Sequence, residues 1–249
     1  MCVVAVTMVK NEADIIADTI THMASQVDQV VVADNGSTDG TREMLETLPC
    51  ELLDDPDPAY WQARKMTALA HYAAEHHGAT WVVPFDADEV WLAAHGTIAQ
   101  TLSGLSERVA PAWVFDHLRT DADPHGTPIR SMQYRRRERT PLHKVAARFR
   151  PGMVIEMGNH QVTYPGVGAP SVAWDQLQVR HFPIRSAQQY IAKARQGAAA
   201  LALTGLDYST GQHWRDWNAL SDEQLADAFL DHWFYRHDDP RLILDPVPL

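Results

Sequence analysis

The sequence predicts an α/β fold: a Rossmann-like sandwich with a mostly parallel central sheet, helices on both of its faces, and a mixed or antiparallel C-terminal part. Two observations predict this class. Up to residue 85, short apolar runs alternate with longer segments whose apolar residues recur at helical spacing, as in βα units. Beyond residue 110, strand-like runs lie between Pro and Gly turns without long helices among them, which favours antiparallel pairing.

The first half supplies the parallel sheet. The predicted strands are residues 2–7, 29–33, 50–53 and 81–85, and the predicted helices are the amphipathic segment after Asn11, residues 41–48 and residues 59–75. Polar motifs follow the first, second and fourth strands. Because ligands of such sheets bind outside the carboxyl ends of the strands, we expect these motifs to share one site.

The second half is expected to complete the same domain. Its predicted strands are residues 112–118, 130–136, 144–149, 153–164 and 177–182, and its predicted helices are residues 186–203 and 222–234. Ser186 and Gln189 form a capping pair for the first of these helices. The Pro-rich residues 239–249 are expected to form a tail.

Composition narrows the function classes. A chain of 249 residues with 45% hydrophobic content favours one domain. The formal net charge of −11 disfavours nucleic acid as a partner. No apolar run approaches the roughly 20 residues of a membrane span.

The N-terminus lacks a charged leader, and the two cysteines, Cys2 and Cys50, lie in apolar contexts. A cytoplasmic protein with unpaired thiols is therefore expected.

The acidic turn Asp86-Ala87-Asp88 is the strongest local signal. It follows the apolar run 82–85 and places two carboxylates one residue apart. Magnesium and manganese prefer oxygen ligands and leave positions open for phosphate oxygens. A metal site and a solvated acidic turn have about equal weight on this motif alone.

The loop from Asp34 to Thr41 is the second signal. Asp34 ends a strand and can accept hydrogen bonds from a base or a ribose, while Gly36 begins a run that offers backbone donors near a helix start. An ordinary strand-to-helix loop has a similar composition. The length of the loop and its place after the second strand favour a function.

Three motifs in this order carry a family resemblance. Residues 7–12 (Thr-Met-Val-Lys-Asn-Glu), 34–41 (Asp-Asn-Gly-Ser-Thr-Asp-Gly-Thr) and 86–89 (Asp-Ala-Asp-Glu) resemble the family-two-like glycosyltransferases of the GT-A fold, over roughly the first hundred residues. Residues 180–186 (Arg-His-Phe-Pro-Ile-Arg-Ser) and 158–160 (Gly-Asn-His) resemble patterns of a bacterial branch of this group. The resemblance implies a metal-dependent, inverting transfer of a sugar from a nucleoside-diphosphate donor to an acceptor hydroxyl.

The resemblance also implies a role for individual residues. The donor would be held by residues of both loops, of the third predicted helix and of the acidic turn: Thr7, Asn11, Glu12, Asp34, Gly36, Gln62, Arg64, Lys65 and Asp86. A manganese or magnesium ion would be bound by Asp86, Asp88 and His181. Residues 1–110 would then form the donor half and residues 111–249 the acceptor half of one domain.

The general base and the acceptor are less defined. Glu156 and His160 are four residues apart in a strand-like run and would share a face, so either is a candidate base. A surface acid and a structural histidine are as well supported, and Asp116 is a weaker candidate. Arg185 or Lys193 would assist the leaving group, although a solvated charge on a helix face is at least as well supported for each. A glycan, a lipid or a small molecule can be the acceptor, and the oligomeric state stays open.

For two further groups of residues, a structural role is favoured over a functional one. The basic cluster 135–139 is expected to be a solvated strand face, with an anionic acceptor site as the minority hypothesis. Trp214, Trp217 and Trp233 stand at helical spacing, which is more typical of a core than of a sugar-binding surface.

Two alternative functions remain open. Residues 86–90 loosely match the nucleophile motif of haloacid-dehalogenase-like phosphatases, with Asp86 as nucleophile and Asp88 as acid. That class carries the motif on its first strand, and it leaves the loop 34–41 without a role. A non-catalytic sugar-nucleotide-binding protein would bind a donor with metal but transfer nothing. A dinucleotide-dependent oxidoreductase is disfavoured because no Gly-x-Gly-x-x-Gly follows the first strand.

Overall fold

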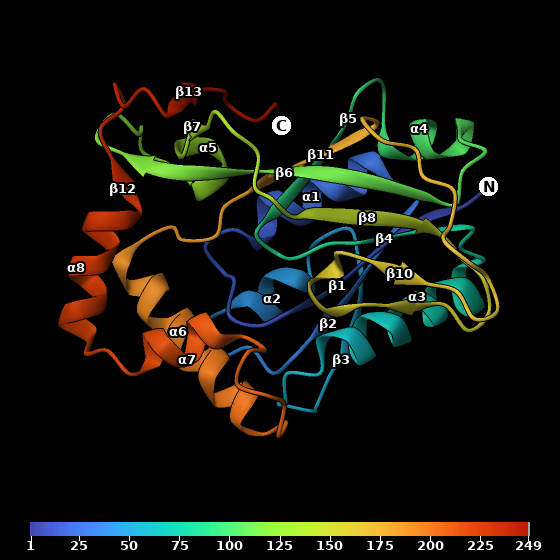
Figure 1. Cartoon of the computed structure of the whole chain (residues 1–249), viewed down its shortest axis with the longest axis horizontal. Coiled ribbons are helices and arrows are strands. Elements are labelled where there is room, and N and C mark those ends of the chain that lie inside the picture. Colours follow the sequence, from blue (N-terminus) through green and yellow to red (C-terminus); the bar gives the residue numbers. More distant parts are fainter. Residues whose placement is uncertain (249) are drawn as a thin grey trace.

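The computed structural model describes residues 1–248 as one mixed sheet with flanking helices (Figure 1). The strands of the sheet are β1 (Val3–Val9), β2 (Gln29–Asp34), β3 (Glu51–Asp54), β4 (Trp81–Pro84), β5 (Glu89–Ala93), β6 (Val109–Thr120), β7 (Tyr134–Arg136), β8 (His143–Arg148), β11 (Leu177–His181), β12 (Phe234–Tyr235) and β13 (Leu242–Leu244). The helices are α1 (Ile16–Gln26), α2 (Thr41–Leu45), α3 (Gln62–His77), α4 (Ile98–Gly104), α5 (Pro128–Ser131), α6 (Ala187–Ala202), α7 (Gln212–Asn218) and α8 (Asp222–His232).

The first half forms the predicted parallel sheet. Its strand order is β4-β1-β2-β3, and β1 pairs in parallel with both β2 and β4. The carboxyl ends of β1, β2 and β4 therefore meet at one edge, where the loops with the predicted donor residues begin. The predicted class, a mostly parallel sheet with helices and a mixed C-terminal part, is confirmed.

The second half continues the same sheet. β8 pairs antiparallel with β4 on one side and with the long strand β6 on the other. β11 lies parallel to β6 and antiparallel to β5, which starts immediately after Asp88. This pairing places His181 opposite Glu89, so the C-terminal histidine reaches the acidic turn.

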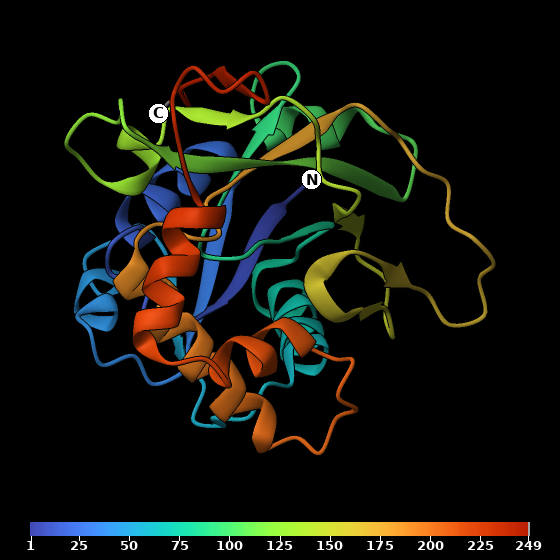
Figure 2. The same ribbon diagram turned by 60° about the vertical axis from the view of Figure 1, so that its left-hand side comes forward.

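Alternating side chains of β1 divide the core into two layers. Val3 and Ala5 face a layer with α1, α2 and α4, whereas Val4 and Val6 face a layer with α3. Residues that alternate between two buried faces explain why the strand reads as a continuous apolar run. A third group of helices, α6 to α8, has its own apolar cluster beside the carboxyl end of β1 (Figures 1 and 2).

Two predicted strands of the second half are wrong. The run 130–136 contains the short helix α5, which begins with Pro128 at its first turn, and only the three-residue strand β7. The run 153–164 is a hairpin of β9 (Val154–Ile155) and β10 (Val162–Thr163) around a 3₁₀ turn, Met157–Asn159. Gly158 and Asn159 have φ of 75° and 58°, which a strand cannot accommodate.

The C-terminal tail and the basic cluster also differ from expectation. β13 pairs antiparallel with β7, so residues 242–244 extend the sheet. Arg135, only 12% exposed, forms an ion pair of 2.5 Å with Asp245, and Arg137 donates to main-chain oxygens of the tail. Arg135 and Arg137 therefore contact the chain's own C-terminal segment, while residues 137–139 are exposed, as expected for a solvated face.

The remaining elements differ less from those expected from the sequence. The helix after β1 begins at Ile16, and Asn11, with φ of 56°, lies in the preceding loop. Ser186 accepts a hydrogen bond from the Gln189 amide as the capping pair predicts. β5, α4 and α7 were not predicted. Both cysteines are free, and no helix of the described residues 1–248 is long and apolar enough to cross a membrane.

Candidate active site

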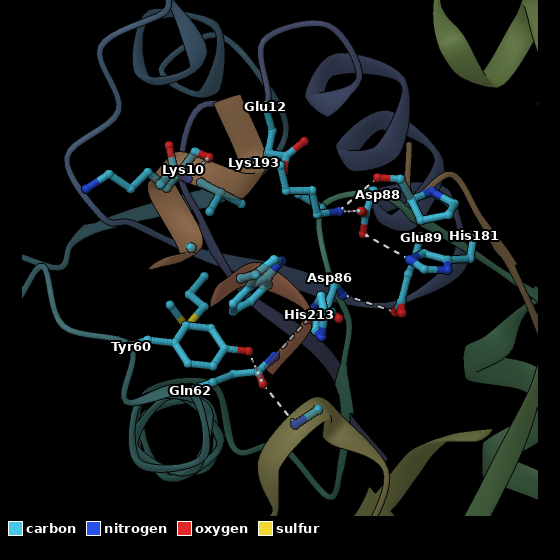
Figure 3. A pocket seen from close by; sticks show the side chains of 18 of the residues that line it. Lys10, Glu12, Tyr60, Gln62, Asp86, Asp88, Glu89, His181, Lys193 and His213 are labelled. Carbon is cyan, nitrogen blue, oxygen red and sulfur yellow. Dashed lines mark hydrogen bonds and ion pairs between the residues drawn. The ribbon is translucent and has the colours of Figure 1, made fainter. Parts of the chain in front are cut away.

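A cavity of about 480 Å³ lies at the carboxyl ends of β1, β2 and β4. Its lining combines residues of the β1 and β2 loops, the acidic turn, β6, β8, β11 and the helices α6 to α8. Figure 3 shows Tyr60 and Gln62 toward one end, Asp88 and His181 toward the other, and Asp86 between them. The motifs that are distant in sequence thus converge on one site.

Three side chains hold the Asp86 carboxylate. Lys144 of β8 donates to Oδ2 at 2.5 Å, Asn159 donates to Oδ1 at 3.0 Å, and Gln62 of α3 donates to Oδ1 at 3.3 Å. Oε1 of Gln62 also accepts a bond from the Gly158 amide, which ties the 158–160 turn to the site. Asp86 is therefore oriented by the turn 158–160 and by Lys144.

Lys144 is buried between two carboxylates. Besides Asp86, it contacts Glu89 Oε1 at 2.8 Å, and Glu89 is completely buried. The second oxygen of Glu89 accepts hydrogen bonds from the Asp86 amide and from Trp91 Nε1. Burial alone would lower the pKa of Lys144, but the two carboxylates outweigh it and raise that pKa above its usual range. Burial raises the pKa of Glu89, against the effect of Lys144.

Asp88 faces a different set of partners. Lys193 of α6 donates to Oδ2 at 2.8 Å, and one guanidinium nitrogen of Arg185 lies 3.8 Å from the same oxygen. Burial would raise the pKa of Asp88, but Lys193, His181 and Arg185 together hold it well below its usual range. Asp88 is thus ionised throughout the physiological pH range.

His181 points its two ring nitrogens at two carboxylates. Nδ1 donates to Asp116 Oδ1 at 2.8 Å, which leaves Nε2 3.7 Å from Asp88 Oδ1 (Figure 3). Burial lowers the pKa of His181, but Asp88 and Asp116 outweigh it and raise that pKa. A histidine oriented in this way by a carboxylate presents a defined nitrogen to a ligand.

The fully buried Arg185 joins the β1 loop to the segment after β11. Its guanidinium forms two bonds of 2.8 Å with Asp14 and one of 2.5 Å with Glu12. Burial raises the pKa of Glu12 above its usual range, although Arg185 opposes the shift. Because its donors are engaged, Arg185 holds the loop, whereas Lys193 lines the cavity together with Lys10 and Lys144.

The predicted metal ligands come together in part. Asp88 Oδ1 and His181 Nε2 face one another at a separation that suits two ligands of one cation, whereas Asp86 turns toward Lys144. Within residues 1–248, no group of three or more His, Cys, Asp or Glu side chains is arranged to hold a metal ion. Magnesium needs fewer protein ligands, since it keeps several waters and is bound through one or two carboxylates plus substrate phosphates. Asp88 supplies one such carboxylate, and His181 Nε2 lies beside it.

The predicted donor residues are distributed unevenly. Glu12, Gln62 and Asp86 line the cavity, while Asn11 lines a smaller neighbouring groove. Asn11 accepts a hydrogen bond from the Thr38 amide and donates to Gln196 of α6. It therefore joins the first two sequence motifs to each other and to α6.

The other predicted donor residues lie outside the cavity lining as described here: Thr7, Asp34, Gly36, Arg64 and Lys65. Thr7 is completely buried, and Asp34 accepts from the Ser37 amide within its own loop. Arg64 and Lys65 pair with acidic residues of the segment 55–57. These side chains shape the loops, and Asn35 is the residue of the second motif that lines the cavity.

The two candidate bases lie in different places, one inside the cavity lining and one outside it. His160 lines the cavity and donates from Nδ1 to the His143 carbonyl at 2.7 Å; burial lowers its pKa, which favours a neutral ring with Nε2 as acceptor. Glu156 accepts from Thr163 and lies outside the cavity lining of the described chain, so the shared strand face that supported it is absent. Asp116, the weaker candidate, does line the cavity.

Sequence reasoning missed Lys144, Tyr60 and Asn35 as parts of the site. Lys144 is 58 residues from Asp86, and a lone lysine in a strand carries no spacing signal. Tyr60 precedes α3, and its hydroxyl donates to Gln62 at 2.9 Å. Its position at the start of a predicted helix, shortly after the third predicted strand, was the available signal.

Part of the sequence matches a known protein family. Residues 4–102 match the family model described as glycosyl transferase family 2. No curated protein matches the sequence. The matched segment contains all three motifs that line or support the cavity.

Several solved structures are similar at low identity. TarS 1–349 of S. aureus in complex with UDP has a TM-score of 0.40 and 12% identity, covering 92% of this chain and 71% of that one. The mannosyltransferase PcManGT from Pyrobaculum calidifontis in complex with GDP-Man and Mn²⁺ has a TM-score of 0.42 and 19% identity, covering 90% and 72%. Mannosyl-3-phosphoglycerate synthase from Rubrobacter xylanophilus has a TM-score of 0.36 and 19% identity, covering 51% and 44%.

The fold rests on the strand order and register given above, and the enzyme class rests on the sequence match. Residues 4–102 are the part of the chain that matches glycosyl transferase family 2, and this match confirms a glycosyltransferase as the enzyme class.

Proposed function

We propose that this protein transfers a sugar from a nucleoside-diphosphate donor to an acceptor hydroxyl, with inversion and with the help of a divalent cation. The observation that carries the proposal is the pair Asp88 and His181, which face one another at the carboxyl end of β4 beside Lys193. This position, between the β1 and β2 loops and the β6 side of the sheet, is where ligands of α/β sheets bind.

The charge of the cavity supports a cation. Five carboxylates line it, Glu12, Asp86, Asp88, Glu89 and Asp116, against three lysines, Lys10, Lys144 and Lys193. With every carboxylate ionised and the histidines neutral, these groups carry two negative charges in excess, of which the Arg185 guanidinium beside Glu12 and Asp88 offsets one. A bound divalent cation reverses the local sign and makes an anionic donor acceptable.

Each residue near the diphosphate then has a defined task. Asp88 and His181 would hold the cation, which supplies stabilisation of the negative charge that develops on the departing nucleoside diphosphate. Asp116 fixes the His181 ring through Nδ1. Lys193 is free to donate to phosphate oxygens once a cation takes over the neutralisation of Asp88.

The proton of the acceptor hydroxyl needs a base on the far side of the donor. His160 and Asp116 both line the cavity. Nε2 of the His160 ring and the carboxylate of Asp116 can each accept a proton. We favour one of these two over Glu156, whose side chain bonds within its own hairpin.

Nucleoside diphosphate release tests the proposal. The protein is incubated with Mn²⁺ and a panel of UDP-, GDP-, dTDP- and CDP-sugars, and released nucleoside diphosphate is measured. We expect release from at least one donor that needs Mn²⁺ and falls at least about a hundredfold in Asp88→Asn, as for loss of a charge-stabilising group. The exposed Asp227→Asn on α8 is the matched control and should retain full activity.

Two results would contradict the proposal. Tight, metal-dependent binding of a donor without any release would indicate a binding protein. Release of inorganic phosphate from an aryl phosphate, abolished by Asp86→Asn, would indicate a phosphatase.

A further inference from the structure

The wall of the cavity that the C-terminal helices provide is aromatic. Tyr60, His213, Trp214, Trp217 and Trp233 all line the cavity. Tyr60 and Trp214 meet edge to face with ring centroids 4.9 Å apart, and His213 lies 4.9 Å from Trp217. Trp217 and Trp233 both contact the ring of Tyr190 in α6, at 4.8 Å and 6.5 Å. His213 also lies 5.0 Å from Trp214, so the rings form one aromatic band, in which Trp217 and Trp233 are joined through Tyr190, outside the lining as described.

The two ends of this band lie over different parts of the sheet. At one end, Trp214 packs on Tyr60, which precedes α3 and lies beside the β2 loop. At the other end, Trp233 directly precedes β12, whose Phe234 pairs with Arg119 near the carboxyl end of β6. The acidic turn after β4 lies between these ends, because β4 stands between β1 and β8 in the sheet.

A donor that spans the β1 and β2 loops and the acidic turn leaves the β6 end of the cavity free. There the lining consists of Val114 and Asp116 of β6, Thr140, Leu142 and Ile184. Trp217 and Trp233 are half-buried: each packs against the apolar cluster of α6 and α8 and still lines the cavity. They are thus neither fully enclosed core residues nor isolated surface residues.

The chemistry of this end fits a sugar ring. A pyranose has apolar C–H faces and a rim of hydroxyl groups. Half-buried tryptophans provide apolar surfaces that can pack against such a face. Asp116 and Thr140 provide a carboxylate and a hydroxyl group at the same end, where they bond to His181 and to the Leu142 carbonyl. A lipid chain would gain from the apolar surface but would cover both polar groups without forming hydrogen bonds to them.

We propose that the acceptor is a carbohydrate whose pyranose ring packs against Trp217 and Trp233. The inference rests on the proposed transferase function and names its acceptor class. In the transfer, the acceptor oxygen forms a bond to the anomeric carbon while the bond from that carbon to the β-phosphate oxygen breaks. The nucleoside diphosphate leaves with that electron pair, and the hydroxyl proton passes to the base.

Acceptor kinetics of matched tryptophan variants test the proposal. With a donor and Mn²⁺, initial rates are measured against p-nitrophenyl glycosides of common hexoses and, in parallel, against decanol dispersed in detergent. Trp233→Leu and Trp217→Leu should raise KM for the glycoside about three- to tenfold, the size of an aromatic contact, and leave KM for the donor unchanged. Trp233→Phe should recover much of the loss.

Trp174→Leu serves as the control, because Trp174 is 41% exposed and lies outside the cavity lining as described. Thermal unfolding of each variant identifies any that fails to fold, and Trp233→Phe keeps the test valid in that case. Transfer to decanol but to no glycoside, or equal acceptor KM values in Trp233→Leu and the wild type, would overturn the inference. Donor hydrolysis without acceptor would persist in either case, so the proposed function is judged separately.

Discussion

Removal of the buried Lys144 ammonium is the sharpest perturbation of this site. Its Nζ lies 2.5 Å from Asp86 Oδ2 and 2.8 Å from Glu89 Oε1, with 8% of the Lys144 side chain exposed and none of the Glu89 side chain. Lys144→Met keeps most of the side-chain volume and leaves the Glu89 carboxylate buried without a counter-charge. Breaking a buried ion pair from one side costs about 3–5 kcal/mol, so we expect a loss of stability of that size.

The loss of stability in Lys144→Met should also depend on pH, in a direction set by Glu89. Burial already raises the pKa of Glu89, and loss of Lys144 raises it further. The carboxyl of the unfolded chain loses its proton above its ordinary pKa, whereas the folded carboxyl keeps its proton up to a raised pKa, so the penalty grows as pH rises between these two values. The penalty in Lys144→Met should therefore be larger at pH 8 than at pH 5.

Urea unfolding followed by far-UV circular dichroism at both pH values measures this. Lys10→Met is the control, because Lys10 also lines the cavity but is not buried, and its substitution should change the free energy of unfolding by less than about 0.5 kcal/mol. The double variant Lys144→Met/Glu89→Gln should recover part of the loss. A loss below about 1 kcal/mol, or a double variant as unstable as the single, would refute the reasoning.

Three further predictions concern packing and pH. Arg185→Lys cannot keep the bidentate bonds of the guanidinium and should lose about 1–3 kcal/mol in urea unfolding; an unchanged midpoint would contradict this. Gly197→Ala places a Cβ 2.5 Å from the Trp214 ring and should cost about 1–3 kcal/mol with a changed tryptophan emission, whereas Gly104→Ala, with open space around its Cβ, should cost little. Burial lowers the pKa of His117 to about 4, so the folded state favours the neutral ring. This preference contributes up to about 3 kcal/mol of stability above pH 6.5, and the contribution is lost as pH falls toward 4. His117→Phe should flatten this loss in urea titrations at pH 7 and pH 4.5, and an equally steep loss would disprove it.

The first half of the fold was predictable because its signals are local. Each parallel strand reads as a short apolar run, and the helix faces repeat within a dozen residues. The carboxyl ends of β1, β2 and β4 then meet by the geometry of parallel pairing alone. For the same reason the convergence of the acidic turn with the two loops could be predicted without coordinates.

The second half depends on contacts that sequence periodicity does not encode. The apolar run 153–164 looks like a strand, but Gly158 and Asn159 reverse the chain and place His160 at the cavity. β13 becomes a strand because β7 and the Arg135 ion pair are present beside it. Gln62 and Asp86 bond to the turn at 158–159, so in both places a long-range partner stabilises the local structure.

The candidate site was predicted where motifs carry it and missed where single residues do. His181 reaches Asp88 because β11 pairs with β5 in a register that puts it opposite Glu89. Asp34 was assigned to the nucleoside, yet its carboxylate binds its own loop, and the neighbouring Asn35 lines the cavity. A one-residue offset of this kind follows from which way a loop turns, which the composition of the loop does not specify.

Calorimetric titration with a nucleoside diphosphate tests the central claim most directly, that Asp88 and His181 bind the donor's diphosphate through a divalent cation. UDP and GDP are titrated into the protein with Mn²⁺ and again with EDTA, for the wild type and for Asp88→Asn. The account predicts binding that requires Mn²⁺ and is lost in the variant. Equal affinity in EDTA, or metal-dependent binding that survives in Asp88→Asn, would contradict it.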